Sequence, residues 1–468
     1  MIRWLKKFLK NLKEKLSESR SNSPGIPSDF DNRKCIKKSS ECFTEIIPES
    51  KNVDNTGNNG EISGCDNVGS GGNRAGSKSA GGNENSSNKI SFAGHESDVM
   101  SYYDNFNLSS SVPSNLTFYK NIKKLYPHIK IPDNAAKATF GCLNPITYVI
   151  EDIVLQKKSM ESEYCVMDIG GGAGFDLFLM KQIMPNSKFL NIDISRNLLK
   201  TGAGVFKSEL GENVNGEGGK TLFVCGNLSK LPIKDNYCAD YIISNAVLNL
   251  IGDKDELLAG MACLLKNDGS MVLCDISYEG GSARNDYALG KKISDGTYFA
   301  PTIINEEEYK KIILKNFNYC HILERHEINP GLKELEGMSF AVNAYLIKKN
   351  PPGEKTDIEC VSCGKKLPVN IYQQVSPDDA PIFLAMIETG ILNTAVCRKC
   401  QKIYTDFAPY YFSWPSKNIY YHVFPSSLKS RRKEFELQIK YLPGRENNPG
   451  LIFGYAEFKR LLDSKNLL

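Results

Sequence analysis

From residue 164 onward, short apolar runs typical of buried strands alternate with segments whose apolar residues recur at helical spacing. The runs are YCVMDIG, KFLNIDIS, TLFVCGN, ADYIISNAV and GSMVLCDIS. Because parallel strands need a crossover helix between them, this alternation predicts an α/β fold with a doubly wound, mostly parallel, Rossmann-like sheet. Residues 98–160 read as mainly helical, so one domain is expected to span 98–350, before the linker NPPGEKTD.

The start of the chain follows a different pattern, with apolar residues at helical spacing and lysines between them. The apolar positions are Ile2, Leu5, Phe8, Leu9, Leu12 and Leu16. This predicts a basic amphipathic helix over 1–17, suited to peripheral contact with an anionic membrane surface. The alternatives are a helix that docks on the body or a partner, or one that stays solvated. Residues 18–97 are rich in Gly, Ser and Asn and are predicted to be a disordered linker.

Charge and cysteine content narrow the class of protein. The net charge is +4, but residues 1–20 hold seven basic and two acidic residues, a balance of +5 that leaves the rest at −1. The body is therefore not expected to bind nucleic acid.

Fourteen cysteines without a secretory signal favour a cytoplasmic location, or the inner membrane face if the first helix attaches there. No stretch is long and apolar enough to span a bilayer, and the oligomeric state is left open.

The stretch VMDIGGGAGFDLFLM, residues 166–180, is the strongest candidate ligand loop. It lacks the Lys-Ser/Thr of a phosphate-binding P-loop, and Phe175 stands where the dinucleotide fingerprint needs its third glycine. An ordinary tight turn is the alternative to a binding loop. The spacing Asp168-x-Gly170-x-Gly172-x-Gly174 resembles motif I of class I S-adenosylmethionine-dependent methyltransferases. The resemblance implies that these four residues bind S-adenosylmethionine.

Three further residues extend that expected cofactor site. Asp193, at the end of the second apolar run, is expected to accept hydrogen bonds from ribose hydroxyls, with helix capping as the alternative. Asn227, in VCGNLSKLPI, is expected to contact the adenine edge. Asn245 and Asn249 flank the end of the fourth strand, which faces the transferred methyl group in the resembled family. Asn245 is therefore expected to bind the cofactor. Asn249 is expected to orient an acceptor or, alternatively, to cap the following turn.

Residues 98–330 resemble arsenite methyltransferases in four segments. These are SYYDNFNLSSS at 101–111, FGCLNPI at 140–146, GAGFDLFL at 172–179 and SNAVLNLIGDKDELL at 244–258. The resemblance fails at the arsenic-binding cysteines, because Ala246 replaces one, two others are absent and only Cys142 persists. Arsenite needs several thiolates, so arsenite methylation is not the expected activity. Cys142 is either an acceptor-pocket thiol, and then a catalytic candidate, or a small buried residue.

Two Cys-x2-Cys pairs mark the C-terminal region. Cys360 and Cys363 are followed, after 33 intervening residues, by Cys397 and Cys400. Four thiolates at this spacing predict a structural Zn²⁺ site, with two redox pairs or disulfides as the alternative. Residues 356–468 also resemble the CpXC domain, with Val361 departing from the proline of that name. A small α+β zinc-binding domain is therefore expected.

These features predict a methyltransferase that transfers a methyl group in line to a small molecule or peptide. Such a displacement requires alignment and exclusion of water, and needs a general base only if the acceptor must lose a proton. Two alternatives are a partner-binding protein on a methyltransferase scaffold without turnover, and a divergent arsenite methyltransferase.

Overall fold

The computed structural model describes residues 99, 119–132, 136, 141–156, 158–216, 219–228, 230–233, 238–279, 302–328, 338–438 and 447–468. The predicted N-terminal helix and linker, residues 1–97, lie outside this part of the chain. In the described part, no helix is both long and apolar enough to cross a membrane.

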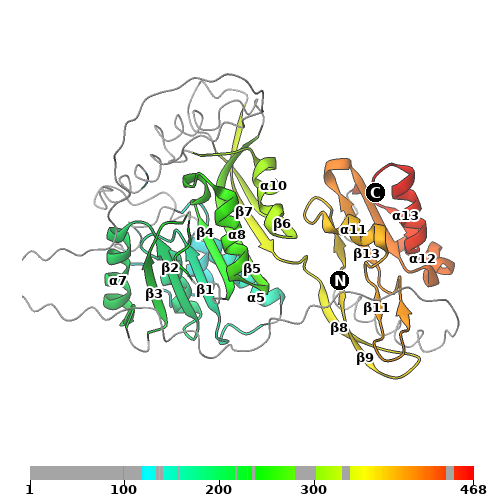
Figure 1. The fold of residues 1–468 in the computed structure, drawn as a ribbon, viewed down its shortest axis with the longest axis horizontal. Helices are drawn as coiled ribbons and strands as arrows, with labels where there is room; N and C mark the ends of the chain where they lie inside the picture. Colours follow the sequence, from blue (N-terminus) through cyan, green and yellow to red (C-terminus); the bar gives the residue numbers. More distant parts are fainter. Residues whose placement is uncertain are drawn as a thin grey trace, which may run out of the picture. The chain divides into compact units, whose positions relative to one another are not determined.

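A seven-stranded sheet forms the centre of the first half (Figure 1), in the order β3-β2-β1-β4-β5-β7-β6. The strands are β1 Cys165–Ile169, β2 Lys188–Asp193, β3 Thr221–Cys225, β4 Ala239–Asn245, β5 Leu265–Glu279, β6 Tyr319–Ile328 and β7 Ser339–Lys348. Strands β1 to β5 are parallel, and β7 runs antiparallel to both of its neighbours. The order reverses between β1 and β4, which is the topological switch point of a doubly wound sheet. The predicted α/β class is confirmed.

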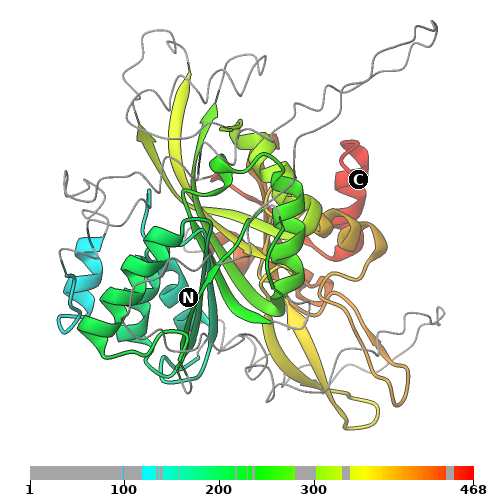
Figure 2. The same cartoon turned by 60° about the vertical axis from the view of Figure 1, so that its left-hand side comes forward.

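Helices cover both faces of this sheet (Figure 2). They are α3 Lys120–Leu125, α5 Pro145–Leu155, α6 Phe175–Ile183, α7 Arg196–Leu210, α8 Lys254–Leu264 and α10 Glu306–Asn316. Successive strand side chains point to opposite faces, so Tyr241 and Ile243 of β4 pack with α5 and α6, whereas Ile242 packs with α8 and α10. This two-sided burial explains why the strands read as continuous apolar runs.

Helix α7 packs closely on the loop after β1 through Gly202. A Cβ atom at Gly202 would lie 2.2 Å from the carbonyl oxygen of Ala173, whereas one at Gly204 would meet nothing within 4 Å. We expect Gly202→Ala to lower the free energy of unfolding by about 1–3 kcal/mol, because backbone must move. Gly204→Ala, in the same helix, is the matched control and should raise it by about 0.5–1 kcal/mol. Denaturant titration of both variants measures this, and equal effects would contradict the packing.

The C-terminal part consists of separate small sheets. The hairpin of β8 Glu354–Glu359 and β9 Lys366–Ile371 precedes the two-stranded pair β11 Ala395–Val396 and β12 Ile403–Tyr404. A four-stranded sheet has the order β10-β13-β14-β15. Its strands are β10 Gln374–Val375, β13 Tyr410–Trp414, β14 Ile419–Phe424 and β15 Gly450–Phe453. Three helices complete this part: α11 Ile382–Thr389, α12 Arg432–Gln438 and α13 Tyr455–Ser464.

Three hydrophobic clusters lie in this region, of which the smallest packs α12 on β14 and β15 through Phe424, Phe435 and Phe453. Of the other two, the larger cluster joins the four-stranded sheet to α11 and α13 through Phe383, Phe412 and Phe458. The smaller one gathers residues of β9 and β11 around Cys360 and Cys397. The chain between Cys363 and Cys397 contains β9, β10 and α11. It returns to the first pair of cysteines, so Cys360 and Cys397 lie in the same cluster.

Candidate functional site

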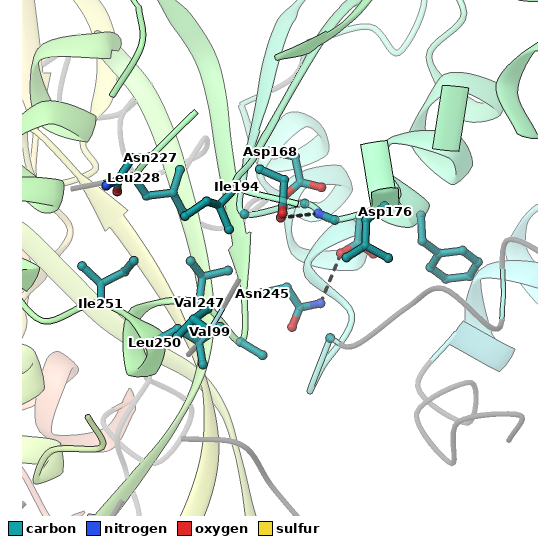
Figure 3. Close-up of a pocket in the computed structure, with 18 residues that line it drawn as sticks. Val99, Asp168, Asp176, Ile194, Asn227, Leu228, Asn245, Val247, Leu250 and Ile251 are labelled. Atoms are coloured by element: carbon teal, nitrogen blue, oxygen red, sulfur yellow. Dashed lines mark hydrogen bonds between the residues drawn. The ribbon is translucent and has the colours of Figure 1, made fainter. Parts of the chain in front are cut away.

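A pocket opens at the carboxyl ends of β1, β2 and β4 (Figure 3). Its described walls include the loop after β1, the residues after β2 and β3, and the turn after β4. The lining residues are Val99, Gly141, Asp168, Gly170, Gly171, Gly172, Phe175, Asp176, Asp193, Ile194, Leu198, Asn227, Leu228, Asn245, Ala246, Val247, Leu250 and Ile251. The position of this pocket at the switch point is where doubly wound folds bind ligands.

The glycine loop adopts a conformation that other residues resist. Gly170, Gly172 and Gly174 have φ values of +75°, +54° and +70°, in the left-handed region. A Cβ at Gly170 would also lie 2.5 Å from a methyl carbon of Val247. Gly174 then starts α6 directly. The loop therefore brings backbone to the pocket with no side chain in the way, as the sequence predicted.

Asp193 holds this loop in place. Its Oδ2 accepts a hydrogen bond from the Gly172 N–H at 2.8 Å, and its Oδ1 accepts one from the Ser195 N–H at 2.8 Å. Ser195 is the residue that caps α7, since its Oγ accepts from the Leu198 N–H. Asp193 is therefore not the cap of α7, and its carboxylate lines the pocket; its contact with ribose stays a prediction. A carboxylate at this place can also accept hydrogen bonds from ligand hydroxyls.

Asn191 is a loop-positioning residue that the sequence analysis missed. It is fully buried, and its Nδ2 donates to the carbonyl oxygen of Gly172 at 2.9 Å. Its Oδ1 and the Oδ1 of Asp168 have no hydrogen-bond partner among the described residues. A Cβ at Gly171 would lie within 2.4 Å of both side chains. The available signal was an amide in an otherwise apolar strand, FLNIDIS.

Asn245 joins the turn at 141–144 to the start of α6. Its Nδ2 donates to the carbonyl oxygen of Leu143 at 2.8 Å and to Asp176 Oδ2 at 3.2 Å, and its Oδ1 accepts from the Cys142 N–H at 2.8 Å. Tyr119 donates to the other Asp176 oxygen at 2.7 Å. Asn245 lines the pocket as predicted, but its amide is largely occupied by the protein. Asp176 is a second pocket residue to which the sequence analysis gave no role.

Three carboxyl groups share this pocket: Asp168, Asp176 and Asp193. Burial raises the pKa of Asp168 well above its ordinary value, and the charges of Asp176 and Asp193 raise it further. Burial raises the pKa of Asp176 to about 6, opposed by hydrogen bonds from Tyr119 and Asn245. A cationic ligand would favour the ionised form of all three groups.

The two predicted catalytic residues lie outside the pocket lining. Cys142 is buried, its thiol lies 3.5 Å from Asn245 Oδ1, and burial, aided by Asp275, raises its pKa well above the ordinary value. The Asn249 amide donates to Asp275 Oδ1 and to the carbonyl oxygen of Ile276, both at 2.6 Å. Cys142 is thus a small buried residue, and the Asn249 side chain binds β5 and does not cap the following turn; the proposed action of both on an acceptor stays a prediction. Asn227, by contrast, lines the pocket, and its contact with adenine stays a prediction.

The four cysteines of the C-terminal part converge. The sulfur atoms of Cys360, Cys363, Cys397 and Cys400 lie within 4.8 Å of one another. The closest pairs, Cys360–Cys400 at 3.4 Å and Cys363–Cys397 at 3.6 Å, exceed any disulfide bond length and approach the roughly 3.8 Å edge of a tetrahedral zinc–thiolate site. The Tyr404 hydroxyl donates to Cys360 Sγ at 3.2 Å. Four thiolates leave no open coordination position, so the donor set suits a structural metal ion.

Comparisons with known proteins agree with this geometry. Residues 160–332 match the family model described as a methyltransferase domain, and residues 358–455 match the CpXC protein model. An arsenite methyltransferase of Halobacterium salinarum is 28% identical over 145 residues, 31% of this chain and 32% of that protein. The arsenite methyltransferase of Homo sapiens is 25% identical over 115 residues, 24% of this chain and 30% of that protein. The chain thus spans about a third of the length of these curated relatives.

Solved structures with a similar arrangement include an arsenic(III) S-adenosylmethionine methyltransferase from Chlamydomonas reinhardtii, with a TM-score of 0.40 and 19% identity. That match covers 48% of this chain and 73% of the other. A putative sarcosine dimethylglycine methyltransferase from Galdieria sulphuraria has a TM-score of 0.34 and 12% identity, covering 44% and 85%. The family models, the sequence relatives and the sheet topology agree that residues 160–332 resemble a class I methyltransferase domain like that of arsenite methyltransferases, and that residues 358–455 resemble a CpXC domain.

Proposed function

We propose that this protein binds S-adenosylmethionine in the pocket at the switch point and transfers its methyl group in line to a small-molecule or peptide acceptor. The observation that carries the proposal is the glycine loop, held by Asp193, beside three carboxyl groups. Because the loop consists largely of glycines, its backbone can closely approach the methionyl and ribose parts of the cofactor. The negative carboxyl groups would attract the positively charged ammonium and sulfonium groups.

The remaining lining supplies complementary contacts. Ile194, Leu228 and Val247 offer apolar surface for the adenine ring, and Asn227 offers an amide that both donates and accepts. The carboxylate of Asp193, which lines the pocket, is an acceptor suited to ribose hydroxyls. The sulfonium supplies an activated methyl group, so the protein has to align the acceptor with it and exclude water.

A specific observation separates this function from arsenite methylation. Ala246 lines the pocket where the resembled family has a cysteine, and Cys142 lies outside the lining with a raised thiol pKa. No thiol belongs to the described lining of the pocket, whereas arsenite needs several thiolates. We therefore propose an acceptor other than arsenite, and keep arsenite methylation as a second candidate because of the named relatives.

Calorimetry with S-adenosylmethionine, followed by methyl-transfer assays with labelled cofactor, tests the proposal. We expect saturable binding with one site per chain and no methylated arsenic after incubation with arsenite. Binding without transfer to any acceptor in a cell extract would support the scaffold alternative. No binding of the cofactor would refute the proposed function, and methylated arsenic products would establish the second candidate.

Affinity for S-adenosylmethionine should fall as the pH is lowered through about 6, the pKa of Asp176. Cofactor binding lowers the pKa of this carboxyl group, so protons are released on binding and the contribution is present above pH 6 and lost below it. The proton of Asp176 alone should make affinity drop roughly tenfold between pH 7.5 and pH 5, and the raised pKa of Asp168 should steepen the drop. Calorimetric titrations across this range measure the slope. S-adenosylhomocysteine, which lacks the sulfonium charge, is the control and should show a weaker dependence; affinity that rises at low pH would contradict the assignment.

We propose further that the four cysteines bind one Zn²⁺ ion with a structural role. Their convergence, and the packing of the small cluster around Cys360 and Cys397, support this. In that role the ion would hold the β8–β9 hairpin to the β11–β12 pair.

A further inference from the structure

The metal-binding end of the CpXC domain exposes an unusual surface. Val361, Val396 and Ile403 are 49%, 48% and 40% exposed, and each lies within three residues of a cysteine of the cluster. Val396 and Ile403 face each other across the β11–β12 pair. Figures 1 and 2 both show the β8–β9 hairpin and the β11 region at one end of this domain. We call residues 360–366 and 396–404 together the knuckle surface.

The knuckle surface is strongly basic. Its two segments contain Lys365, Lys366, Arg398, Lys399 and Lys402, which outnumber the neighbouring exposed Glu359, opposite Lys366 in the β8–β9 hairpin. All of these except the half-buried Lys402 are exposed. A zinc ion with four thiolates carries a charge of −2, which five positive charges exceed, so a net positive charge remains. The surface is therefore complementary to an anionic partner.

The types of exposed side chain on the knuckle surface indicate which class of anionic partner it would bind. Single-stranded nucleic acid is bound by basic grooves with exposed aromatic rings for base stacking. The one aromatic residue of the knuckle surface is Tyr404, which is half-buried and donates its hydroxyl to Cys360 Sγ. Branched aliphatic side chains among lysines and arginines are instead suited to a lipid interface, where aliphatic groups enter the acyl boundary and cations remain at anionic headgroups.

We propose that the knuckle surface binds the anionic surface of a membrane. The basic amphipathic helix expected over residues 1–17 would be a second attachment in the same chain. Stable peripheral attachment takes two weak signals, and together these two segments would supply them. The proposal does not depend on the proposed methyl transfer.

Co-sedimentation of the full chain with vesicles tests this proposal. The vesicles are phosphatidylcholine alone, or phosphatidylcholine with one third phosphatidylglycerol. We expect binding only to the anionic vesicles, weakened by salt. At about 1 kcal/mol for each basic residue near the surface, the double variant Arg398→Gln/Lys399→Gln should lower the partition coefficient on the order of 30-fold. The matched control, Lys433→Gln/Lys465→Gln, removes the same charge from exposed sites outside the knuckle surface and should change little.

A second variant, Val396→Ser/Ile403→Ser, keeps every charge and should lower the partition coefficient by roughly fivefold for each residue, at a transfer free energy of about 1 kcal/mol each. The zinc content of each variant should equal that of the wild type. Weaker vesicle binding then reflects a lost contact with the membrane and not a disrupted metal site. Unchanged vesicle binding in both knuckle variants would overturn the proposal, because the N-terminal segment alone would then account for attachment. Tight binding of a short polyuridine RNA, abolished by Arg398→Gln/Lys399→Gln, would also overturn it in favour of nucleic acid.

Discussion

Asp193→Asn should lower affinity for S-adenosylmethionine by at least about 100-fold. The wild-type carboxylate accepts hydrogen bonds from the N–H groups of Gly172 and Ser195 and lines the pocket. An amide nitrogen in place of one oxygen points a donor at a backbone donor, so one of the two backbone hydrogen bonds that residue 193 accepts is lost. Hydrogen bonds to a charged group contribute about 1.5–3 kcal/mol each, and the proposed ribose contact would be weakened as well.

Calorimetric titration of the variant against the wild type measures this loss. The matched control is Asp253→Asn, because Asp253 also accepts a backbone hydrogen bond, from the Glu256 N–H at 3.0 Å, but caps α8 and does not line the pocket. Its effect should be confined to stability, at about 1 kcal/mol or less. Thermal unfolding of both variants shows whether the fold survives. Wild-type affinity in Asp193→Asn would contradict the cofactor site assigned to this pocket.

Loss of zinc should unfold one part of the CpXC domain and spare the other. The purified chain should contain one equivalent of zinc, and Cys397→Ser should contain almost none. Binding of structural zinc contributes about 10–16 kcal/mol in small zinc domains, far more than the small cluster around Cys360 and Cys397 can replace. The four-stranded sheet has its own core around Phe412 and Phe458 and should remain folded.

Hydrogen exchange followed by mass spectrometry distinguishes these regions. Without zinc, we expect protection to be lost over residues 354–371 and 395–408 and kept over β13 and β14. Cys263→Ser, which replaces an exposed free cysteine of α8, is the control and should keep both the metal and the protection. A chain that holds no metal, or in which two of the four cysteines form a disulfide, would contradict the zinc assignment.

Local patterns predicted the elements that build the pocket. Each of the five parallel strands coincides with an apolar run, because strands buried on both faces have few polar positions. The glycines of the loop were recognisable because their conformation excludes other residues, and three of them do adopt positive φ values. Asp193 and Asn227 line the pocket as expected from their positions at the ends of strands. Carboxyl ends of parallel strands share one edge of a sheet, so such residues meet.

Residues joined by long-range contacts could not be assigned in this way. Cys142 and Asn249 were expected to act on an acceptor, but the structure places them outside the pocket lining, against Asn245 and Asp275 respectively. The role of Asp176 depends on Tyr119 and Asn245, which lie 57 and 69 residues away in the chain. No local pattern encodes such pairings.

By itself, the sequence determined the α/β class, the glycine loop, the carboxyl residues at the strand ends and the two cysteine pairs, since periodicity, backbone conformation and ligand spacing are local properties. Only the tertiary structure decided that Asn191 and Asp193 hold the loop from the neighbouring strand, that Asn245 joins the turn at 141–144 to α6, and that the four cysteines converge. The physical reason is that hydrogen bonds and metal coordination act over a few ångströms, and the folding of the whole chain determines which distant residues come that close.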